Sequence, residues 1–506
     1  MNIKKIIKII LISGLVLLLT ASCQTSPNAN EKPNNENPGG DAQAAKADDG
    51  EPQEEPAERI YPELEAKDFG GYEFTFLIRT IKHADWAEWD HRDLYAEEIN
   101  GDVINDAVYN RNKKIEEKYN IIIKEIVVEN PLEPKLISAI RAGDDIYDVV
   151  CPHFVQFPAV AQAGNYVDFF KIPHLDLTQP WWNQGVIRDL SIINRLFIMQ
   201  GDLLILDNDA MEAMIFNKKL HKDNELENLY ETVKKGEWTF SKLTELTKGI
   251  SKDLNGDGQM YIKDDLFGCI LQSAVSNSFI VSGGEKICGK DANDYPVITF
   301  GSERCYRTMD AISELMIDEN NVVNLHRYEG QFAVYDEQVK MMEENRALFS
   351  WIRMRIVERL RGMETDFGIL PLPKLDKNQQ NYITHNDPHA GVGISVPVTA
   401  SDLERTGMIL EDLSAESRYT LQPVYYEINL RGKFARDDES QEMLDIILNN
   451  SAFDIGYVYD FGGFAMGVIL HSGRDKITEF ASAFEKAEDR MQRAIDKTLE
   501  AYENLD

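Results

Sequence analysis

The sequence predicts an α/β fold built on a parallel sheet with helical crossovers. After a Gly-Gly turn, residues 71–78 alternate between polar and apolar side chains and then become continuously apolar, which is typical of a strand. Val103–Tyr119 places apolar residues near helical spacing, with charges between them. A β-rich stretch at 120–128, a helical stretch at 132–141 and a short buried strand at 147–151 follow. This alternation of strand and helix favours parallel strands, because each crossover helix carries the chain back to start the next strand in the same direction.

The 506-residue chain suits two or more lobes, because single hydrophobic cores stop growing at roughly 250–300 residues. The later segments continue the mixed pattern. We expect a strand pair at 195–205, an apolar face on 210–220, a helix capped by Thr239 or Ser241 that runs to Ile250, helices at 309–316 and 332–345, strands at 347–351, 367–373 and 391–398, and a long amphipathic helix at 475–505.

The N-terminus has the layout of an export signal. Met1–Lys8 carries three lysines, residues 9–19 are apolar, and small residues then lead to Cys23. The apolar run is shorter than the roughly 20 residues that span a bilayer. The ending resembles the lipobox of bacterial lipoproteins, although Thr20 stands where that pattern prefers leucine. The resemblance implies a lipoprotein signal peptide at 1–22 and a lipid anchor on Cys23; an ordinary secreted protein cut near Ala21 is the alternative.

Composition limits what the rest of the chain can be. Residues 24–58 hold Asn, Pro, Gly, Ala and acidic residues, so we expect a disordered linker after the anchor. The net charge of −33 makes nucleic acid a poor partner. Export would permit a disulfide between Cys269 and Cys288 or between Cys288 and Cys305, but the spacing fixes no pairing. We expect free, buried thiols at Cys151, Cys269, Cys288 and Cys305.

The order of segments resembles the extracellular solute-binding proteins of ABC importers, in the group that includes the maltodextrin-binding type. The resemblance covers residues 68–459. The motifs that carry it are Asp68–Tyr72, Gly101–Val108, Gly143–Asp148, Gly236–Thr239, Phe367–Pro373 and Ile446–Asn450.

This resemblance implies an α/β, two-lobed periplasmic-binding-protein type II fold with a ligand cleft between the lobes. Lobe 1 would take residues 59–195 and lobe 2 residues 196–390; residues 391–506 would return to lobe 1 with hinge segments and C-terminal helices. The implied function is a monomeric, extracytoplasmic, membrane-tethered receptor that has no catalytic chemistry. It would capture a solute, most often a sugar or oligosaccharide, and deliver it to an ABC permease.

Two other classes of function stay open. A surface carbohydrate-active enzyme would need two opposed carboxylates in a cleft, and with 86 acidic residues the sequence neither shows nor excludes such a pair. No G-x-S-x-G or H-E-x-x-H motif is present. A sensory or adhesive lipoprotein on the same fold is the third interpretation.

Candidate ligand-binding residues follow from the chemistry of sugars. In open α/β sheets, ligands sit outside the carboxyl ends of strands. Sugars present apolar faces ringed by hydroxyls, so a binder needs flat aromatics, carboxylates, amides or arginine. The candidates of these types are Arg79, Trp86, Trp89, His153, Phe154, Trp181, Trp182, Asp202, Asp207, Asp209, Trp351 and Arg353. Each tryptophan has the alternative of a core side chain, and His153 has no partner at metal-ligand spacing.

Residues 253–264 follow the D-x-N-x-D-G loop of calcium-binding hands, in which oxygens at positions one, three and five converge on the ion. Gly258 would permit the sharp turn at position six. An aspartate stands at position twelve, where glutamate is usual, and Asp265 is a second candidate there. The predicted ligands of a structural Ca²⁺ are Asp253, Asn255, Asp257, Gln259 through its carbonyl, and Asp264. A surface turn without an ion is the alternative.

Overall fold

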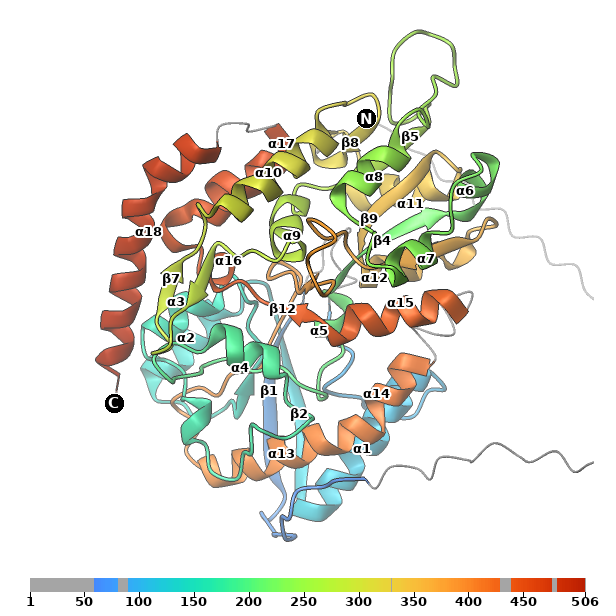
Figure 1. Cartoon of the computed structure of the whole chain (residues 1–506). Coiled ribbons are helices and arrows are strands. Elements are labelled where there is room, and N and C mark those ends of the chain that lie inside the picture. Colours follow the sequence, from blue (N-terminus) through green and yellow to red (C-terminus); the bar gives the residue numbers. More distant parts are fainter. Residues whose placement is uncertain (1–58, 81–89, 329, 428–437, 476–479, 506) are drawn as a thin grey trace, which may run out of the picture. The chain divides into compact units, whose positions relative to one another are not determined.

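The strands of the protein gather in two main sheets, which form the cores of two lobes (Figure 1). The structure is a computed structural model that describes residues 59–80, 90–328, 330–427, 438–475 and 480–505. The signal peptide, Cys23 and the linker predicted at the N-terminus lie outside this range. Within it, the two-lobed α/β fold predicted from the sequence is confirmed.

The smaller sheet has the order β2-β1-β3. Its strands are β1 (Tyr72–Thr80), β2 (Ile121–Glu129) and β3 (Val149–Val150). Both pairings of β1 are parallel, as the alternation of strand and helix predicts.

The crossover helices of this sheet are α1 (Val103–Tyr119) and α2 (Glu133–Ala142). Helix α1 begins where the sequence predicts because the side chain of Asp102 accepts hydrogen bonds from two first-turn backbone N–H groups. It ends at Asn120, whose left-handed φ of 45° stops the helical path.

The larger sheet has the order β10-β4-β9-β5-β8. Its strands are β4 (Glu212–Asn217), β5 (Phe267–Leu271), β8 (Val322–Asn324), β9 (Ala347–Arg353) and β10 (Phe367–Leu370). Strand β4 runs antiparallel to β9 and β10, whereas β5 is parallel to β8 and β9. Every residue of these strands is buried, so the sequence shows continuous apolar runs here instead of alternation.

Three segments differ from the sequence prediction. Residues 210–220 do not present one apolar face: β4 is buried on both sides and is followed by α6 (Lys218–Asp223). Residues 195–205 and 391–398, predicted as strands, form only single bridges, for example between Met199 and Ile394. No ladder develops because successive residues of 391–398 pair with different segments: Val392 with His153, Ile394 with Met199 and Ser395 with Val150.

Short elements complete the fold, and Figure 1 shows their placement. Helix α8 begins at the predicted cap, where Thr239 accepts a hydrogen bond from the backbone N–H of Lys242. The other helices are α3 (Phe157–Gln162), α4 (Gln184–Leu190), α5 (Leu206–Asp209), α7 (Leu229–Lys234), α8 (Phe240–Thr247), α9 (Val275–Ser282), α10 (Glu303–Met316), α11 (Val334–Glu343), α12 (Met354–Val357), α13 (Leu403–Tyr419), α14 (Leu421–Val424), α15 (Asp438–Asn449), α16 (Ile455–Val458), α17 (Leu470–Asp475) and α18 (Phe480–Glu503). The minor strands are β6 (Cys288–Lys290), β7 (Pro296–Ile298), β11 (Thr384–His385) and β12 (Ser451–Ala452). A 3₁₀ turn, η6 (Phe461–Gly463), and a π-helical turn, η7 (Ala465–Ile469), precede α17.

The C-terminal helix α18 packs as its sequence pattern predicts. Its predicted apolar stripe is buried at Phe480, Phe484, Ala487, Met491 and Ile495. The sixth predicted member of the stripe, at position 477, lies outside the described residues. Helix α18 contacts η6, β7 and α3, and it runs along the left edge of the view in Figure 1.

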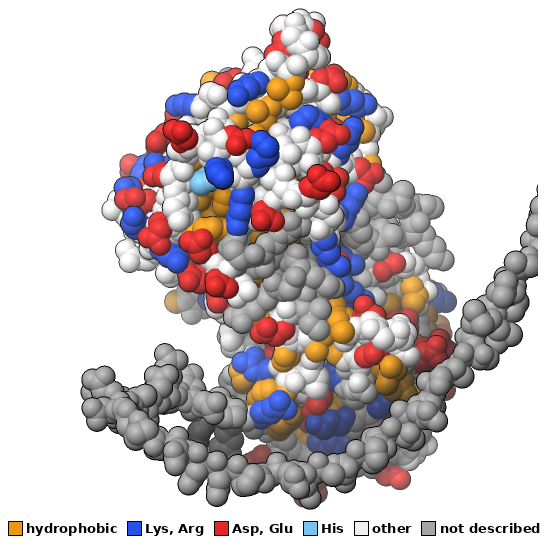
Figure 2. Space-filling view, turned by 90° about the vertical axis from the view of Figure 1, so that its right-hand side faces the viewer, with side chains coloured by type: hydrophobic (Ala, Val, Ile, Leu, Met, Phe, Trp, Pro, Cys, Tyr) orange, Lys and Arg blue, Asp and Glu red, His pale blue; other side chains and the backbone are white. Residues whose placement is uncertain are grey.

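Surface and cysteine chemistry are ordinary. The four cysteines of the described chain are free and buried, which confirms the expectation of unpaired thiols. Figure 2 shows a face on which acidic and basic side chains are interspersed. None of the described helices is both long and apolar enough to cross a bilayer. The lobe boundaries proposed at 195/196 and 390/391 stay predictions.

Candidate ligand-binding site

A buried ion pair joins the large sheet to the segment that follows β11. Arg353, the last residue of β9, donates from Nε to Asp387 Oδ2 at 2.6 Å. Its guanidinium carbon lies 5.1 Å from the ring centroid of Trp351. Although burial opposes ionisation, Arg353 holds the pKa of Asp387 at about 2. Asp387 in turn raises the pKa of Arg353 despite its burial, so both groups are charged at neutral pH.

A second buried pair lies on the neighbouring strand. Glu212 opens β4 and stands opposite Arg353 in register, and its Oε2 lies 3.3 Å from His385 Nδ1. Burial raises the pKa of Glu212. Burial alone would lower the pKa of His385, but the Glu212 carboxylate raises it. The His385 ring stacks on Tyr457 with centroids 5.6 Å apart.

Amides and hydroxyls at the start of helix α9 reach the same region. Helix α9 packs against β11, next to His385. Gln272, which follows β5, donates from Nε2 to Gln338 Oε1 at 2.6 Å. Gln338 also donates to the carbonyl of Trp351. The hydroxyl of Tyr457 lies beside the Asn277 amide, but no hydrogen bond of regular geometry joins either group to a described residue.

These residues form one group, which we call the polar cluster: Glu212, Gln272, Ser276, Asn277, Trp351, Arg353, His385, Asp387 and Tyr457. Several of its buried atoms have no hydrogen-bond partner in the part of the chain that the structure describes. They are Glu212 Oε1, Gln272 Oε1, Ser276 Oγ, both Asn277 amide atoms, Trp351 Nε1, His385 Nε2 and the Tyr457 hydroxyl. An unpaired buried polar group costs about 1–3 kcal/mol and is uncommon in folded proteins. A polar ligand that pairs with these atoms would offset that cost.

Five of the twelve sequence-predicted binding residues lie in or next to the polar cluster. Trp351 and Arg353 belong to it. The Nε2 atom of His153 contacts the carbonyl oxygen of His389, and the His389 backbone N–H donates to Asp387 at 2.9 Å. The other two are Arg79 and Phe154.

Arg79 and Phe154 flank this side of the cluster. Burial lowers the pKa of His153 well below its ordinary value, and the nearby Arg79 guanidinium lowers it further. The Arg79 Nε atom is buried without a partner among the described residues. Phe154 packs on Phe453 with ring centroids 5.6 Å apart. Their roles in ligand binding stay predictions.

Four more predicted residues surround a separate pocket of about 400 Å³. Trp181, Trp182, Asp202 and Asp207 line it, together with amide side chains such as Asn208 and Gln422. Both tryptophans are 1–2 % exposed, so their faces pack in the core and do not form an open stacking surface. The polar lining of this pocket includes the two carboxylates together with these amides.

The remaining predicted residues lie elsewhere. Asp209 is fully buried and forms ion pairs with Arg92 at 3.2 Å and Arg355 at 3.6 Å. These contacts place Asp209 in a buried network of ion pairs. Trp86 and Trp89 lie outside the described residues. Their assignments, like those around the 400 Å³ pocket, stay predictions.

Glu411, which is hydrogen-bonded to Trp182 of that pocket, makes the stability of the protein depend on pH. It accepts a hydrogen bond from Trp182 Nε1 at 2.9 Å, and burial raises its pKa from 4.5 to about 7. Between these two values the folded protein binds more protons than the unfolded chain, so this carboxyl destabilises the fold as the pH rises. We expect Glu411→Gln to stabilise the protein at about pH 8 by up to about 3 kcal/mol, and to do much less at about pH 5. Urea denaturation at both pH values measures the difference; equal effects at both would contradict it.

The polar cluster contains residues that the sequence analysis missed. Gln272 and Ser276 come directly after β5, so the same rule about strand ends that selected Trp351 also applies to them. Glu212 stands at the start of β4. His385 ends β11 and Asp387 follows it, but the sequence analysis predicts no strand at 384–385, so the rule does not select them.

The predicted calcium loop is folded around two carboxylates. Asp253 accepts hydrogen bonds from the backbone N–H groups of Gly256 at 2.6 Å and Gly258 at 2.7 Å. The buried Asp265 accepts from Leu254 at 2.8 Å and closes the loop. Within the described residues no three His, Cys, Asp or Glu side chains are grouped as a metal site. The loop motif also uses amide and backbone oxygens as ligands.

Comparison with known proteins supports the fold. No protein-family model and no curated protein matches the chain. Solved structures do match: the cyclic alpha-maltosyl-1,6-maltose binding protein from Arthrobacter globiformis has a TM-score of 0.56 at 11% identity, covering 84% of this chain and 99% of that one. UgpB from Mycobacterium tuberculosis, in complex with glycerophosphocholine, has a TM-score of 0.54 at 12% identity, covering 85% and 99%.

A third match has the same extent. The ABC substrate-binding protein Lmo0181 from Listeria monocytogenes, in complex with cycloalternan, has a TM-score of 0.52 at 12% identity and covers 84% of this chain and 99% of that one. Each match spans nearly the whole of its own chain. The protein therefore has the two-lobed fold of the solute-binding proteins, as the sequence analysis predicts.

Proposed function

We propose that this protein is the substrate-binding lipoprotein of an ABC importer and that it captures a sugar or oligosaccharide between its lobes. The observation that carries the proposal is the polar cluster. Several of its buried N–H and O atoms have no hydrogen-bond partner among the described residues, in a fold shared with sugar-binding receptors. The export signal and Cys23 support a lipid-anchored receptor that hands its cargo to a membrane permease.

The chemistry of the polar cluster fits a polyhydroxylated solute. Carboxylate and amide oxygens accept hydrogen bonds from sugar hydroxyls, whereas Trp351 Nε1 and the Asn277 amide nitrogen donate to them. The charged pair of Arg353 and Asp387 is already satisfied internally, so it orients the site without demanding a charged ligand. A neutral, hydroxyl-rich ligand is therefore favoured over an ionic one.

The placement of the polar cluster also explains how binding would drive closure. Its residues come from β4, β9 and α9 in the larger lobe and from the 384–387 and 457 segments, while His153 of the smaller lobe contacts the carbonyl of His389 beside it. A ligand that contacts all of them binds the closed arrangement better than an open one and shifts the population toward it.

A thermal-shift screen of the soluble chain from residue 59 tests this proposal. Oligosaccharides, monosaccharides and short peptides are added separately, and each mixture is analysed afterwards for products. A ligand present at 100 times its dissociation constant stabilises a protein by about 2.7 kcal/mol. One sugar class that raises the melting temperature without turnover supports the receptor. Turnover of that sugar favours the enzyme alternative, and a panel with no shift contradicts a sugar receptor.

We also propose that the loop at 253–265 binds Ca²⁺ as a structural ion. Its hydrogen bonds engage Asp253 and Asp265 but leave lone pairs on the carboxylates for a cation. Millimolar calcium is expected to raise the melting temperature, and Asp257→Ala is expected to abolish that rise. Asp223→Ala, a change of equal charge at an exposed site, is the control. An identical response of both variants to calcium and to a chelator would contradict the site.

A further inference from the structure

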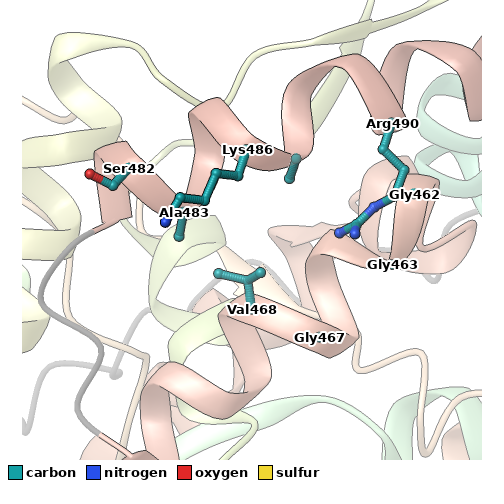
Figure 3. Close-up of a pocket in the computed structure, with 9 residues that line it drawn as sticks. Gly462, Gly463, Gly467, Val468, Ser482, Ala483, Lys486 and Arg490 are labelled. Atoms are coloured by element: carbon teal, nitrogen blue, oxygen red, sulfur yellow. The ribbon is translucent and has the colours of Figure 1, made fainter.

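A pocket lies between helix α18 and the two helical turns η6 and η7. It has a volume of about 570 Å³. Figure 3 shows the Arg490 side chain extending from α18 toward the turn that carries Gly463, and the Lys486 side chain extending along the helix toward Ala483. The residues that line the pocket are Gly462, Gly463, Gly467, Val468, Ser482, Ala483, Lys486, Ala487 and Arg490.

Glycines keep this pocket open. Gly462 has a φ of 64°, and a Cβ there would lie 2.7 Å from the Met491 backbone nitrogen, so only glycine lets the turn approach α18 so closely. Gly463 and Gly467 have empty space where a side chain would begin. The floor of the pocket is therefore backbone, and its polar character comes from the helix above it.

The two charged side chains that line the pocket are both basic. Lys486 and Arg490 stand four residues apart on one face of α18, which brings their Cβ atoms to about 5–6 Å of each other. Neither has an ion-pair partner among the described residues, and the lining contains no acidic side chain. Burial raises the pKa of Asp460, and the nearby Arg490 guanidinium only partly opposes that rise; the Asp460 carboxylate accepts the Met466 backbone N–H at 3.0 Å. Two basic side chains without an ion pair among the described residues therefore line one pocket of a chain whose net charge is −33.

We propose that this pocket binds a phosphate group, either inorganic phosphate or the phosphate of a small organic ester. Arginine presents a planar fork that matches two phosphate oxygens, and lysine adds a point charge. Ser482 also lines the pocket, in the first turn of α18. The small apolar surfaces of Val468 and Ala483 leave room for the carbon part of an ester. The site shares no residue with the polar cluster and does not depend on the proposed function.

The test measures binding of inorganic phosphate and of glycerol phosphate to the soluble chain by calorimetry, with sodium chloride added to equal ionic strength. We expect saturable binding that weakens at least tenfold in the double variant Lys486→Gln/Arg490→Gln. The matched control is Arg493→Gln/Lys497→Gln, which makes the same charge change on exposed positions of α18 outside the pocket and is expected to bind as the wild type does. A tighter affinity for the ester than for inorganic phosphate assigns the site to organic phosphates, and the reverse assigns it to the free ion.

A steric variant separates the pocket from general electrostatics. Gly467→Leu adds bulk where nothing lies within 4 Å of a new Cβ, so it fills the pocket without a clash and without a charge change. It is expected to weaken phosphate binding as strongly as the double charge variant while its circular dichroism spectrum stays that of the wild type. Absence of saturable binding by the wild type, or equal weakening in the pocket and control variants, overturns the proposal.

Discussion

Arg353→Met is expected to lower the free energy of unfolding by about 3–5 kcal/mol. The change leaves Asp387 fully buried and ionised without its partner, in surroundings where burial opposes its charge. It also removes the guanidinium from the Trp351 ring and from the Tyr335 hydroxyl. Urea denaturation followed by tryptophan fluorescence gives the difference from the midpoint and slope.

Two controls decide whether the loss comes from the stranded charge. The double variant Arg353→Met/Asp387→Leu removes both charges and is expected to recover a large part of the stability, because no ion is left buried alone. Lys377→Met breaks an exposed ion pair, in which Lys377 Nζ lies 2.6 Å from Glu237 Oε1. That variant is expected to lose less than about 1 kcal/mol. A similar loss from Arg353→Met would show that the Arg353–Asp387 pair contributes little.

Asn277→Leu is expected to weaken solute binding by about 5- to 150-fold while leaving the stability of the ligand-free protein unchanged or higher. Both polar atoms of the Asn277 amide are buried without a partner among the described residues, so the free protein gains when an apolar side chain of similar size replaces them. The bound protein loses, because the hydroxyls of the ligand then face an apolar group. Calorimetric titration with the sugar found in the screen measures the affinity, and thermal unfolding without sugar measures the stability.

Two serines give this prediction a matched control. Ser276 and Ser414 are both buried with an unpartnered hydroxyl, but only Ser276 belongs to the polar cluster. Ser276→Ala is expected to weaken binding in the same direction as Asn277→Leu, and Ser414→Ala is expected to bind as the wild type does. If all three variants keep full affinity, the polar cluster is not the solute site.

Local signals determined most of the elements of this fold. The helix at Val103–Tyr119 was predicted to the residue, because its apolar spacing and the cap at Asp102 act within one stretch of chain. The stripe of α18 was predicted for the same reason, since residues three and four apart meet on one face wherever a helix forms. The segments at 195–205 and 391–398 were mispredicted because a strand needs a partner that continues alongside it, and composition does not report whether one does.

The candidate site was decided by tertiary structure. Trp351 and Arg353 are candidates from the sequence because they lie near the end of a strand, where α/β folds bind ligands, and their role in binding stays a prediction. The sequence does not single out Glu212 and His385, because their neighbours are far away along the chain and become contacts only when β4, β11 and the segment after β12 assemble. Burial likewise separates Trp181, a core side chain, from an exposed sugar platform of the same residue type. Sequence specifies which groups are available; whether a buried polar atom lacks a partner is a property of the folded packing, and that property marks the site.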